Sequence, residues 1–477
     1  MVWVNITGDL PPMTFTQIRF SDIQHVMRIG STGRGLWEAP IPCGYEAGSI
    51  NITGAVAWND TRTIKKNIYV KNGGTLTVTG DLYMGENIKI VVERGGLLLL
   101  DGALLTSYCG GLWQGIEVWG NPKQASTLPY QGKVVLRNGS IIENAVNGIR
   151  AAKIVNGGTE SELLETKYAG GIIQAVESEF RNNKSDVAMY KYPATGYTFQ
   201  NSSFFRKCEF VTDKMYFTEY DTCTHVKLSE VNMVKFHACG FKNESFEPYY
   251  GKGIYSFNSA FLVEGIDTGG TQGTMWDRTE FYNLKYGIYA TAATTLPYAD
   301  VRHSHFNDNE RGLYLGGMSN ARVTENLFEL FGELEDGTYG LYLDYSTGYM
   351  VEENEFVSGI ASNFRGAGII VNNSGEAQNE LYNNYFYRLE TAILAQNCNR
   401  SLDYLKGLKI KCNDHDFNKR DILVIADSTC SLPGVSINQG APGATEMQAG
   451  NTFSWFYNPL NPTDSDFENI EDGPVTY

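Results

Sequence analysis

Short runs of alternating apolar and polar residues recur along this chain, and turns that contain glycine separate them. Segment 70–80 (VKNGGTLTVTG) matches segment 92–102 (VERGGLLLLDG) at an offset of 22 residues, and a weaker third copy begins at Val135. Alternation after a Gly turn is typical of a short β-strand that buries one face. The N-terminal part of the chain therefore predicts short strands at a regular spacing.

A second form of the repeat takes over from residue 141. It reads apolar-x-x-Asn-x-apolar, followed by Gly-Ile-x-apolar or a close variant. Segment 323–328 (VTENLF) precedes 340–343 (GLYL), and segment 351–356 (VEENEF) precedes 368–371 (GIIV). Ser, Thr or Cys takes the place of Asn in several copies. The recurring position falls on residues 144, 178, 208, 239, 279, 304, 326, 354, 384, 413 and 451.

Repeats this short cannot bury their apolar faces alone, whereas stacked copies form a continuous core. We therefore predict an all-β solenoid, a right-handed parallel β-helix in which each strand pairs with its counterpart in the next coil. Eleven coils at a strand spacing of ~4.8 Å would be roughly 50 Å long, and the Gly-Gly coils would extend this length. We expect the helix to span residues 41–453. Residues 1–40 are interpreted as an N-terminal cap or the remnant of a preceding segment, and residues 454–477 as a C-terminal cap or linker.

The recurring Asn position has a structural explanation. Side chains at equivalent positions stack at one strand spacing, so their amides can bond along the ladder. Asn also tolerates the left-handed corner that ends a strand. Cys208 and Cys239 share this row in neighbouring coils, so we predict that their Cα atoms lie about 4.4–6.8 Å apart, as stacked thiols or as a disulfide. The predicted ladder consists of Asn144, Asn326, Asn354, Asn384, Asn413 and Asn451.

The overall charge narrows the class of protein. Lys and Arg number 38 against 54 Asp and Glu, which gives a net charge of −16. A nucleic-acid partner requires a basic surface, and adsorption to anionic membranes requires the same, so neither is expected. No stretch of about 18 apolar residues is present, so we predict no transmembrane segment.

The N-terminus and the cysteines bear on localisation. Residues 1–9 (MVWVNITGD) have neither the basic nor the apolar region of a signal peptide. The protein is therefore intracellular, or the chain is a mature segment of a longer polypeptide. Eight Cys are present without a Cys-x-x-Cys pair. Buried thiols, disulfides in a secreted protein and a metal site all remain open from the spacing alone.

A resemblance favours secretion. Segment 97–120, with DGALLTS at 101–107 and CGGLWQGIEVWG at 109–120, together with the downstream Asn coils, resembles secreted right-handed parallel β-helix proteins of Bacteroidota. These are similar to the pectate-lyase-like superfold and are often exported by the type IX secretion system. The resemblance covers roughly residues 50 to 453. It implies an extracellular or cell-surface protein, without implying an activity.

Enzymes of that superfold cut acidic polysaccharides, so the resemblance invites a search for their motifs. The polygalacturonase-like sets (Asn-Thr-Asp, Asp-Asp, Gly-His-Gly, Arg-x-Lys) and the pectate-lyase-like Arg-x-x-Pro-x-x-Arg are all missing. The coil alignment nevertheless predicts that several charged residues are neighbours. An Arg there would neutralise a uronate and a His or Glu would act as base, or two carboxylates would serve glycoside hydrolysis. The alternative is ion pairing between coils on a solvated face. The candidates are Arg278, Glu280, Arg302, His303, His305, Glu325 and Glu353.

A second row points outward, at the variable position of Gly-Ile-x-apolar. It contains Tyr255, Tyr289, Tyr314 and Tyr342, followed by apolar residues. Such a row on a solenoid requires an explanation. It is either a platform for glycans or a protein partner, or a ladder of rings that stack on one another or lie beneath loops.

From these features we expect a non-catalytic extracellular scaffold or adhesin-type segment, exported as type IX cargo. Its expected partners are polysaccharides or proteins of the cell surface or secretion system. A polysaccharide lyase or glycoside hydrolase is the alternative, and a passive stalk is a third. No cofactor and no metal ligand set are assigned, although the acidic turn 413–416 (NDHD) offers oxygen ligands for Ca²⁺.

Overall fold

The structure is a computed structural model. The described residues are 15–21, 26–33, 35–40, 46–108, 110–154, 164–214, 223–269, 275–294, 297–360, 363–403, 405–426, 430, 433–440, 448–454 and 465–470.

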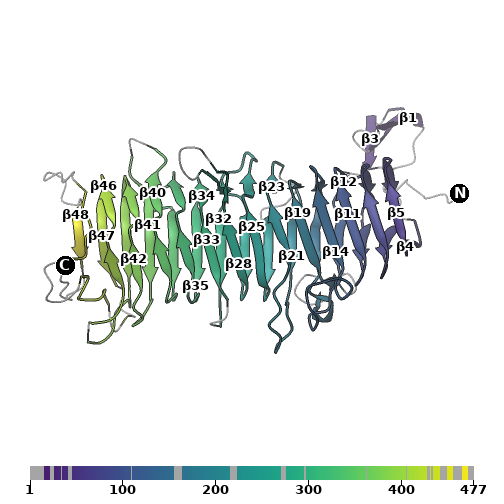
Figure 1. Ribbon diagram of the computed structural model, residues 1–477. Helices are drawn as coiled ribbons and strands as arrows, with labels where there is room; N and C mark the ends of the chain where they lie inside the picture. The colour runs from purple at the N-terminus through teal and green to yellow at the C-terminus, as the bar shows by residue number, and fades with distance from the viewer. Residues whose placement is uncertain are drawn as a thin grey trace.

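Three long parallel sheets run side by side along one axis, and the chain winds around that axis as a right-handed parallel β-helix (Figure 1). Each complete coil contributes one strand to each sheet, in the order sheet 1, sheet 2, sheet 3. The longest sheet contains 15 strands, which at ~4.8 Å per spacing corresponds to a length of roughly 65 Å. The fold predicted from the repeat is confirmed.

Sheet 1 begins the coils and extends past residue 453, because β48 pairs in parallel with β47. Its strands in spatial order are β4 (Ser49–Ile52), β7 (Asn67–Val70), β10 (Lys89–Val92), β13 (Trp113–Val118), β16 (Ala145–Ala151), β21 (Ser185–Met189), β24 (Thr224–Ser229), β27 (Lys252–Phe257), β32 (Tyr286–Thr291), β35 (Arg311–Gly316), β38 (Tyr339–Asp344), β41 (Arg365–Asn372), β44 (Leu389–Gln396), β47 (Arg420–Ile425) and β48 (Ser465–Asn469).

Sheet 2 follows sheet 1 around each coil. Its strands are β5 (Ala55–Trp58), β8 (Thr75–Val78), β11 (Leu97–Asp101), β14 (Lys133–Arg137), β19 (Ile172–Val176), β22 (Phe204–Arg206), β25 (Asn232–His237), β28 (Ala260–Glu264), β33 (Ala299–Arg302), β36 (Arg322–Thr324), β39 (Met350–Glu352), β42 (Glu380–Tyr382) and β45 (Lys409–Lys411).

Sheet 3 closes each coil. Its strands are β6 (Arg62–Ile64), β9 (Leu82–Met84), β12 (Leu104–Ser107), β15 (Ile141–Glu143), β20 (Glu179–Arg181), β23 (Glu209–Thr212), β26 (Gly240–Asn243), β31 (Thr279–Tyr282), β34 (Ser304–Asn307), β37 (Leu327–Leu330), β40 (Glu355–Ser358), β43 (Tyr385–Tyr387) and β46 (Asp414–Asp416).

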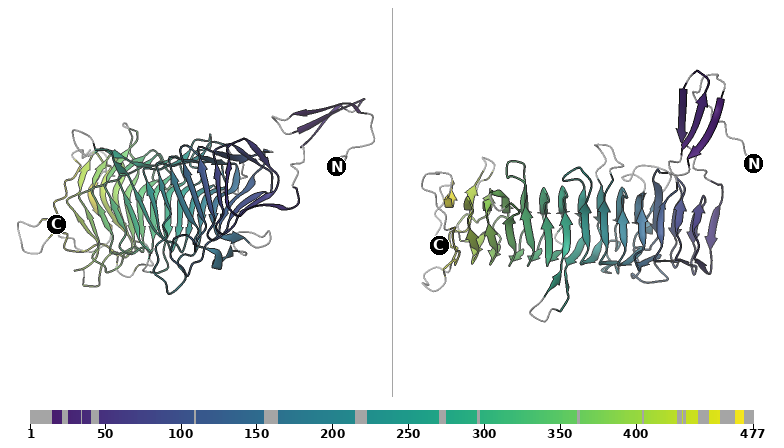
Figure 2. Two further views of the ribbon diagram at one scale, coloured as in Figure 1. Left: turned by 45° about the vertical axis from the view of Figure 1, so that its right-hand side comes forward. Right: turned by 90° about the horizontal axis from the view of Figure 1, so that it is seen from above.

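Within the ranges given above, three small sheets lie outside the coils. An antiparallel sheet of β1 (Phe15–Ser21), β2 (Val26–Ser31) and β3 (Gly35–Pro40) stands beside the N-terminal end of the helix (Figure 2). Two hairpins interrupt coils: β17 (Lys153–Ile154) with β18 (Leu164–Glu165), and β29 (Ile266–Asp267) with β30 (Trp276–Asp277). A short 3-10 helix, η1 (Thr166–Tyr168), follows β18.

The strand register follows the repeat in its clearest copies. Val70 pairs with Val92 and Leu76 with Leu98, as the offset of 22 residues requires. The third copy was assigned to the wrong strand, because Val135 pairs with Leu99 rather than with a residue near Val92. Its Asn-Gly turn therefore corresponds to the turn at Gly102, between sheets 2 and 3.

One continuous row of side chains runs through the interior beneath sheet 3. Its N-terminal members are Leu82, Leu105 and Ile142, and phenylalanines follow. Neighbouring rings are nearly parallel, with centroids 4.6–5.2 Å apart from Phe180 to Phe386. These contacts bury each ring almost completely. The phenylalanines of the row are Phe180, Phe210, Phe241, Phe281, Phe306, Phe328, Phe356 and Phe386.

The Asn ladder runs through the corner between sheets 2 and 3. From Asn354 onward, each Asn accepts at its side-chain oxygen the backbone N–H and the amide N–H of the Asn one coil before, and donates to a backbone carbonyl of the preceding coil. Asn354, for example, accepts from Asn326 at 3.1 and 3.0 Å and donates to the Val323 carbonyl at 2.9 Å. The same pattern continues through Asn384, Asn413 and Asn451. The ladder thus satisfies buried backbone groups at every corner.

Asn144 does not belong to this ladder. The ladder position of its coil is Ser140, whose hydroxyl accepts the N–H of Ala103, and Ser140 aligns with Ser178 through the pairing of Ile141 with Glu179. Asn144 lies at the next corner, where its amide donates to Thr106. The motif Ile-Ile-Glu-Asn-Ala-Val imitates the repeat in a different register.

The left-handed corner residue is also not the Asn itself. It is the preceding residue, with φ of 48° at His303, 57° at Glu325 and 57° at Glu353. The Asn is required for its buried hydrogen bonds rather than for its backbone conformation. Cys208 and Cys239 occupy the ladder position of consecutive coils and are buried free thiols, so they stack without forming a disulfide.

Candidate functional site

The predicted charged residues gather around the corner between sheets 2 and 3. His303 lies in that corner, and the indole of Trp276, from the hairpin β29–β30, stacks on it at a centroid distance of 3.4 Å. Its Nδ1 lies 3.3 Å from Glu325 but makes no hydrogen bond. Burial lowers the pKa of His303, so the ring is neutral at pH 7.

The two arginines of the patch are already engaged. Arg278 donates to the backbone carbonyl of Glu325 at 2.8 Å. Arg302 lies 2.7 Å from Glu264 and 3.3 Å from Asp300. Glu264, on the preceding coil, pairs in register with Arg302, and the hairpin β29–β30, which carries Asp277, is inserted after that strand.

The remaining candidates lie on sheet 3 or further along the axis. Glu280 pairs in register with His305, as the alignment predicts. His305 Nε2 is hydrogen-bonded to Glu329 at 2.7 Å, and Glu280 lies 3.3 Å from Lys242. Glu353 is exposed on the coil after Glu325. The patch therefore consists mainly of ion pairs between coils, and its cations each hold a partner within the described residues.

The predicted Tyr row lies on the outer face of sheet 1. Tyr255, Tyr289, Tyr314 and Tyr342 are consecutive in register. The first three rings are parallel within 5°, with centroids 5.8 and 4.7 Å apart, whereas the last is tilted by 41°. Each ring covers the face of its neighbour, so mainly ring edges and hydroxyls point outward.

The apolar continuation of this row is covered. Ile370 and Leu394 are each only 5% exposed, and they cluster with Tyr339 and with Leu334 from the loop after β37. The Leu334 N–H donates to Glu390 at 3.0 Å, which holds that loop against the sheet. The half-buried tyrosines are thus the accessible part of the row.

A groove of about 490 Å³ opens at the corner between sheets 1 and 2, where we predicted no site. We call it the corner groove. It spans the connections of four consecutive coils, after β21, β24, β27 and β32. Its described lining comprises residues 191–198, 230–232, Asn258, Ala260, Thr294 and Pro297. None of the sequence-predicted candidates lines it.

Hydrogen bonds hold the wall of the corner groove in place. The Tyr192 ring is fully buried and its hydroxyl donates to the Gln124 carbonyl at 3.0 Å. The Ala194 N–H donates to Pro122, and the Asn232 N–H donates to Tyr192. These bonds fix the long loop 190–203 against the coil before it and the coil after it.

The lining of the corner groove is polar but nearly uncharged. Tyr197 is 43% exposed and stacks on Phe199 at 5.7 Å. Thr195, Thr198, Asn232 and Asn258 supply hydroxyl and amide groups. Lys191 and Glu230 form a 2.8 Å ion pair with each other. Glu230 is therefore the one carboxylate of the described lining, whereas acid hydrolysis of a glycoside uses two.

The feature of the sequence that corresponds to this groove is a long loop, which lies outside the repeated positions. Segment 193–198 (PATGYT) lies in a Pro- and Gly-containing connection between β21 and β22, which is longer than the equivalent connections of the two following coils. Repeat alignment discards such insertions, which is why the groove escaped prediction.

In the acidic turn 413–416, considered above as a source of Ca²⁺ ligands, the side chains point alternately into the interior and toward solvent. Asn413 and His415 are buried, whereas Asp414 is exposed. Among the described residues, no group of three or more His, Cys, Asp or Glu side chains is arranged to hold a metal ion. Within the same residues, no helix has the length and apolar character needed to cross a membrane.

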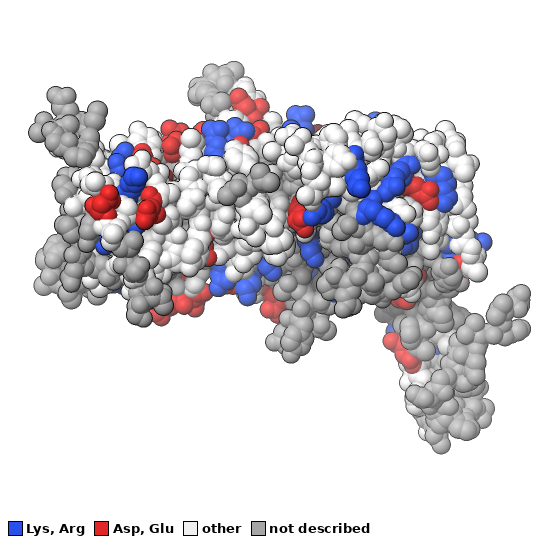
Figure 3. Space-filling model, turned by 90° about the horizontal axis from the view of Figure 1, so that it is seen from below, with Lys and Arg blue, Asp and Glu red and all other residues white. Residues whose placement is uncertain are grey.

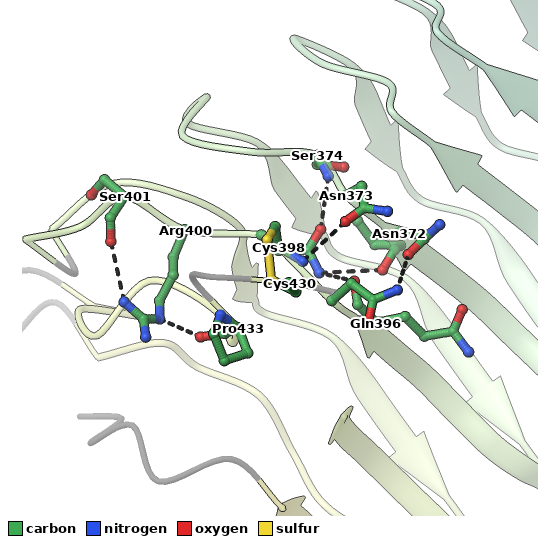
Figure 4. The surroundings of a disulfide bond; sticks show 12 residues. Asn372, Asn373, Ser374, Gln396, Cys398, Arg400, Ser401, Cys430 and Pro433 are labelled. Atoms are coloured by element: carbon green, nitrogen blue, oxygen red, sulfur yellow. Dashed lines mark hydrogen bonds between the residues drawn. A yellow bond between two sulfur atoms is a disulfide. The ribbon is translucent and has the colours of Figure 1, made fainter. Parts of the chain in front are cut away.

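One disulfide fastens the C-terminal part of the helix (Figure 4). Cys398 and Cys430 are bonded, with Cα atoms 5.6 Å apart. Cys398 follows β44 at the corner between sheets 1 and 2, and its N–H donates to Asn373 of the preceding coil. Cys223 and Cys412 are free thiols like Cys208 and Cys239. Cys43 and Cys109 lie outside the described residues.

Sequence comparison gives one partial family match. Residues 207–402 match the family described as periplasmic copper-binding protein (NosD), over less than half of the 477 residues. None of the curated proteins matches this chain in sequence.

Three solved structures share the coiled architecture at low similarity. The mannuronan C-5 epimerase AlgE4 A-module of Azotobacter vinelandii is 10% identical, with 84% of this chain and 91% of that chain covered and a TM-score of 0.35. The tailspike protein of E. coli bacteriophage HK620, solved in complex with a pentasaccharide, is 14% identical, with coverages of 83% and 61% and a TM-score of 0.32. The periplasmic alginate epimerase AlgG is 12% identical, with coverages of 86% and 78% and a TM-score of 0.23. The fold assignment rests on the strand pairings of the present chain.

Proposed function

We propose that this chain is a secreted, non-catalytic β-helix scaffold that binds carbohydrate in the corner groove. The groove itself is the observation that carries the proposal. Its volume of about 490 Å³ falls within the range of roughly 300–1,000 Å³ that is typical of ligand sites. Its walls are held by backbone hydrogen bonds, so little ordering would accompany binding.

The chemistry of the lining suits a sugar. Amide and hydroxyl groups of Asn232, Asn258 and Thr195 match the hydroxyls of a saccharide, which both donate and accept. The half-exposed ring of Tyr197 offers an apolar surface next to them. The four coils of the groove span about 14 Å along the axis, since three spacings of ~4.8 Å separate them. An extended oligosaccharide fits this geometry better than a single sugar.

A binding role, rather than a catalytic one, agrees with the observation that ionisable groups at both corners are already paired with neighbouring side chains. The carboxylate of Glu230 is paired with Lys191 inside the groove. At the other corner, Arg302 and His305 are paired with Glu264 and Glu329. A catalytic acid or base needs contact with substrate, and these groups instead contact the neighbouring coil.

Secretion is supported by the disulfide and by the resemblance. The Cys398–Cys430 bond persists only in an oxidising compartment. The coils and the Trp-Gln-Gly-Ile segment at 113–116 resemble type IX secretion cargo of Bacteroidota. We therefore propose an extracellular or cell-surface location, with polysaccharides or surface proteins as partners.

The test is a glycan-binding screen with the full chain and two variants. Tyr197→Ala removes the exposed ring of the groove, and we expect it to weaken binding about tenfold, because a contact of ~1.4 kcal/mol is lost. Tyr382→Ala is the matched control, since Tyr382 is 37% exposed on the outer face of sheet 2, away from the groove. Failure to bind any glycan, or equal binding by both variants, overturns the proposal.

A lyase is the second candidate, favoured by His303 alone. Its ring is held neutral by burial, beside Arg278 and Arg302, and its Nδ1 makes no hydrogen bond. A neutral imidazole next to cations is suited to remove a proton from a uronate. We would incubate the chain with acidic polysaccharides and follow the absorbance of unsaturated products. Turnover that is lost in His303→Gln would favour the lyase over the scaffold.

A further inference from the structure

Three cations surround a pair of aromatic rings at the N-terminal side of the corner groove. We call Arg94, Trp119, Lys153, Lys167 and Tyr168 the cation–aromatic cluster. The Lys153 ammonium lies 5.0 Å from the centroid of Trp119 and 4.7 Å from that of Tyr168. The Arg94 guanidinium lies 4.7 Å and the Lys167 ammonium 5.4 Å from the Tyr168 centroid. Figure 3 shows Lys and Arg side chains gathered over this part of the helix.

The charges of Arg94 and Lys153 are not neutralised by acidic side chains of the described residues. Arg94 donates to the backbone carbonyls of Gly120 and Lys167. Lys153 contacts the two rings. The carboxylate of Glu117 on β13, beside Trp119, is already bonded to Lys89 at 2.8 Å and to the Trp119 indole at 3.0 Å. Holding Arg94 and Lys153 close to the same ring costs free energy through repulsion, so their placement in a chain of net charge −16 favours an anionic ligand.

The cluster and the corner groove lie on the same edge of the helix. Arg94, Trp119 and Tyr168 belong to the sheet 1 to sheet 2 connections of three consecutive coils, and the groove occupies the next four. The two regions also contact each other. A Cβ on Gly170, two residues after Tyr168, would lie 2.5 Å from the ring of Tyr192 in the groove wall. The same edge therefore carries first a cationic and then a neutral binding surface.

We propose that the ligand of this edge is an acidic polysaccharide that lies along the helix axis, with carboxylate or sulfate groups on Arg94 and Lys153 and the remaining sugar units in the corner groove. This inference rests on the proposed function and names its substrate class. Arg and Lys bind such oxyanions by charge-assisted hydrogen bonds. Trp119 and Tyr168 supply rings against which the apolar side of a sugar packs.

The experiment compares four polymers of similar length on the full chain: polygalacturonate, a sulfated polysaccharide, a neutral glucan and polyphosphate. We expect polygalacturonate or the sulfated polysaccharide to bind most tightly, and the preferred one identifies the anionic group. We expect this affinity to fall with rising salt, whereas binding of the neutral glucan responds little. Polyphosphate tests charge alone, and binding as tight as that of the sugars overturns the proposal.

The double variant Arg94→Gln/Lys153→Gln tests the cluster directly. We expect the affinity for the acidic polysaccharide to fall about a hundredfold, since each lost charge-assisted bond corresponds to about tenfold. The control Lys235→Gln/Lys409→Gln removes the same charge from the outer face of sheet 2 and should change binding less than about threefold. If the double variant does not fold, Lys153→Gln alone is expected to lose about tenfold.

The outcomes separate this inference from the proposed function. Equal binding of neutral and acidic polymers, unaffected by the double variant but weakened by Tyr197→Ala, overturns the acidic ligand and leaves the groove as a carbohydrate site. Loss of binding in the double variant with an unaffected Tyr197→Ala overturns the groove and leaves the cluster as the site. Absence of binding to all four polymers overturns both.

Discussion

The two ends of this helix fold the same backbone with different side chains. Beneath sheet 3, the N-terminal coils place Leu82, Leu105 and Ile142, whereas the C-terminal coils place stacked rings such as Phe328. The corners differ as well. At the corner between sheets 2 and 3, Gly102 turns an N-terminal coil with φ of 66°, whereas Glu353 has φ of 57° in a C-terminal coil.

This difference shows that the coil does not depend on one set of contacts. The N-terminal coils combine close aliphatic packing with the backbone freedom of glycine. The C-terminal coils tolerate left-handed non-glycine corners, because Asn side chains in the interior bond to each coil on both sides. The following predictions test how much the N-terminal coils depend on aliphatic packing and glycine corners, and how much the C-terminal coils depend on stacked rings and the Asn ladder.

The largest effect is expected from the ring row. Phe328→Ala should lower the free energy of unfolding by about 4 kcal/mol, because it removes a ring that stacks at 4.6 Å on both neighbours. Leu105→Ala, in the same row of the N-terminal coils, should cost about 3 kcal/mol. Guanidinium denaturation followed by circular dichroism measures both. A larger loss for Leu105→Ala would contradict the view that rings dominate the C-terminal coils.

The Asn ladder should give the next effect. Asn354→Ala removes the acceptor of the buried Asn326 N–H and the amide that donates to the Val323 carbonyl, so we expect a loss of about 3 kcal/mol. Ser140→Ala, at the same position of an N-terminal coil, should cost only about 1 kcal/mol, since it accepts one N–H from the preceding coil. Asn307→Ala, on the outer face of sheet 3, serves as the control and should leave the denaturation midpoint nearly unchanged.

The one histidine of the ring row predicts a dependence on pH. Burial lowers the pKa of His415 to about 3, and neither ring nitrogen has a hydrogen-bond partner. Because the unfolded chain binds this proton near pH 6.5 and the folded chain does not, stability falls as the pH drops from about 6.5 toward 3. His415→Phe should remove this loss and gain about 2 kcal/mol at pH 5 relative to the parent.

Denaturation midpoints of both proteins at pH 5 and pH 8 provide the measurement. Burial raises the pKa of the neighbouring Asp421 to about 6, which has the opposite effect on stability, and this group is present in both proteins. A gap between the two proteins that is no wider at pH 5 than at pH 8 would show that His415 does not titrate on unfolding.

The smallest effect concerns the corners. Gly102→Ala should cost about 1 kcal/mol, almost entirely from its left-handed backbone, since a Cβ there would meet only the Asn138 carbonyl oxygen, at 3.4 Å. Glu353→Gly should instead leave stability unchanged or raise it by about 0.5 kcal/mol, as relief of strain exceeds the lost chain stiffness. Thermal melts of the two variants decide this point. A destabilised Glu353→Gly would mean that its side chain, not its backbone, holds the corner.

The sequence predicted the parts of this molecule that repeat. Stacked coils place the same residue type at equivalent positions, so Asn354 and the phenylalanines of the row recur at a regular interval that can be recognised in the sequence. Asn144 was misplaced because its motif lies four residues from the ladder position at Ser140. A short motif that matches the repeat in sequence does not determine the register, because the register is set by the pairing of strands.

The candidate site was harder to predict, because its residues lie in the connecting loops, which do not follow the repeat. The corner groove forms from loops of unequal length, and the cation–aromatic cluster joins Arg94 to Lys153 across 59 positions of the sequence. No period connects such residues. The Tyr row was visible in the sequence, but the orientation of its rings depends on side-chain packing that a pattern does not contain.

The disulfide has a mechanical consequence. When the C-terminus is pulled along the axis, β48 peels from β47 first, and the tension then reaches Cys430. From there it passes through the covalent bond to Cys398, 32 residues earlier in the sequence. The strands β45, β46 and β47 lie between the two cysteines and bear no tension. The covalent bond therefore limits unfolding under force to the chain that follows Cys430, and the parallel sheets that precede Cys398 stay folded until a larger force is applied.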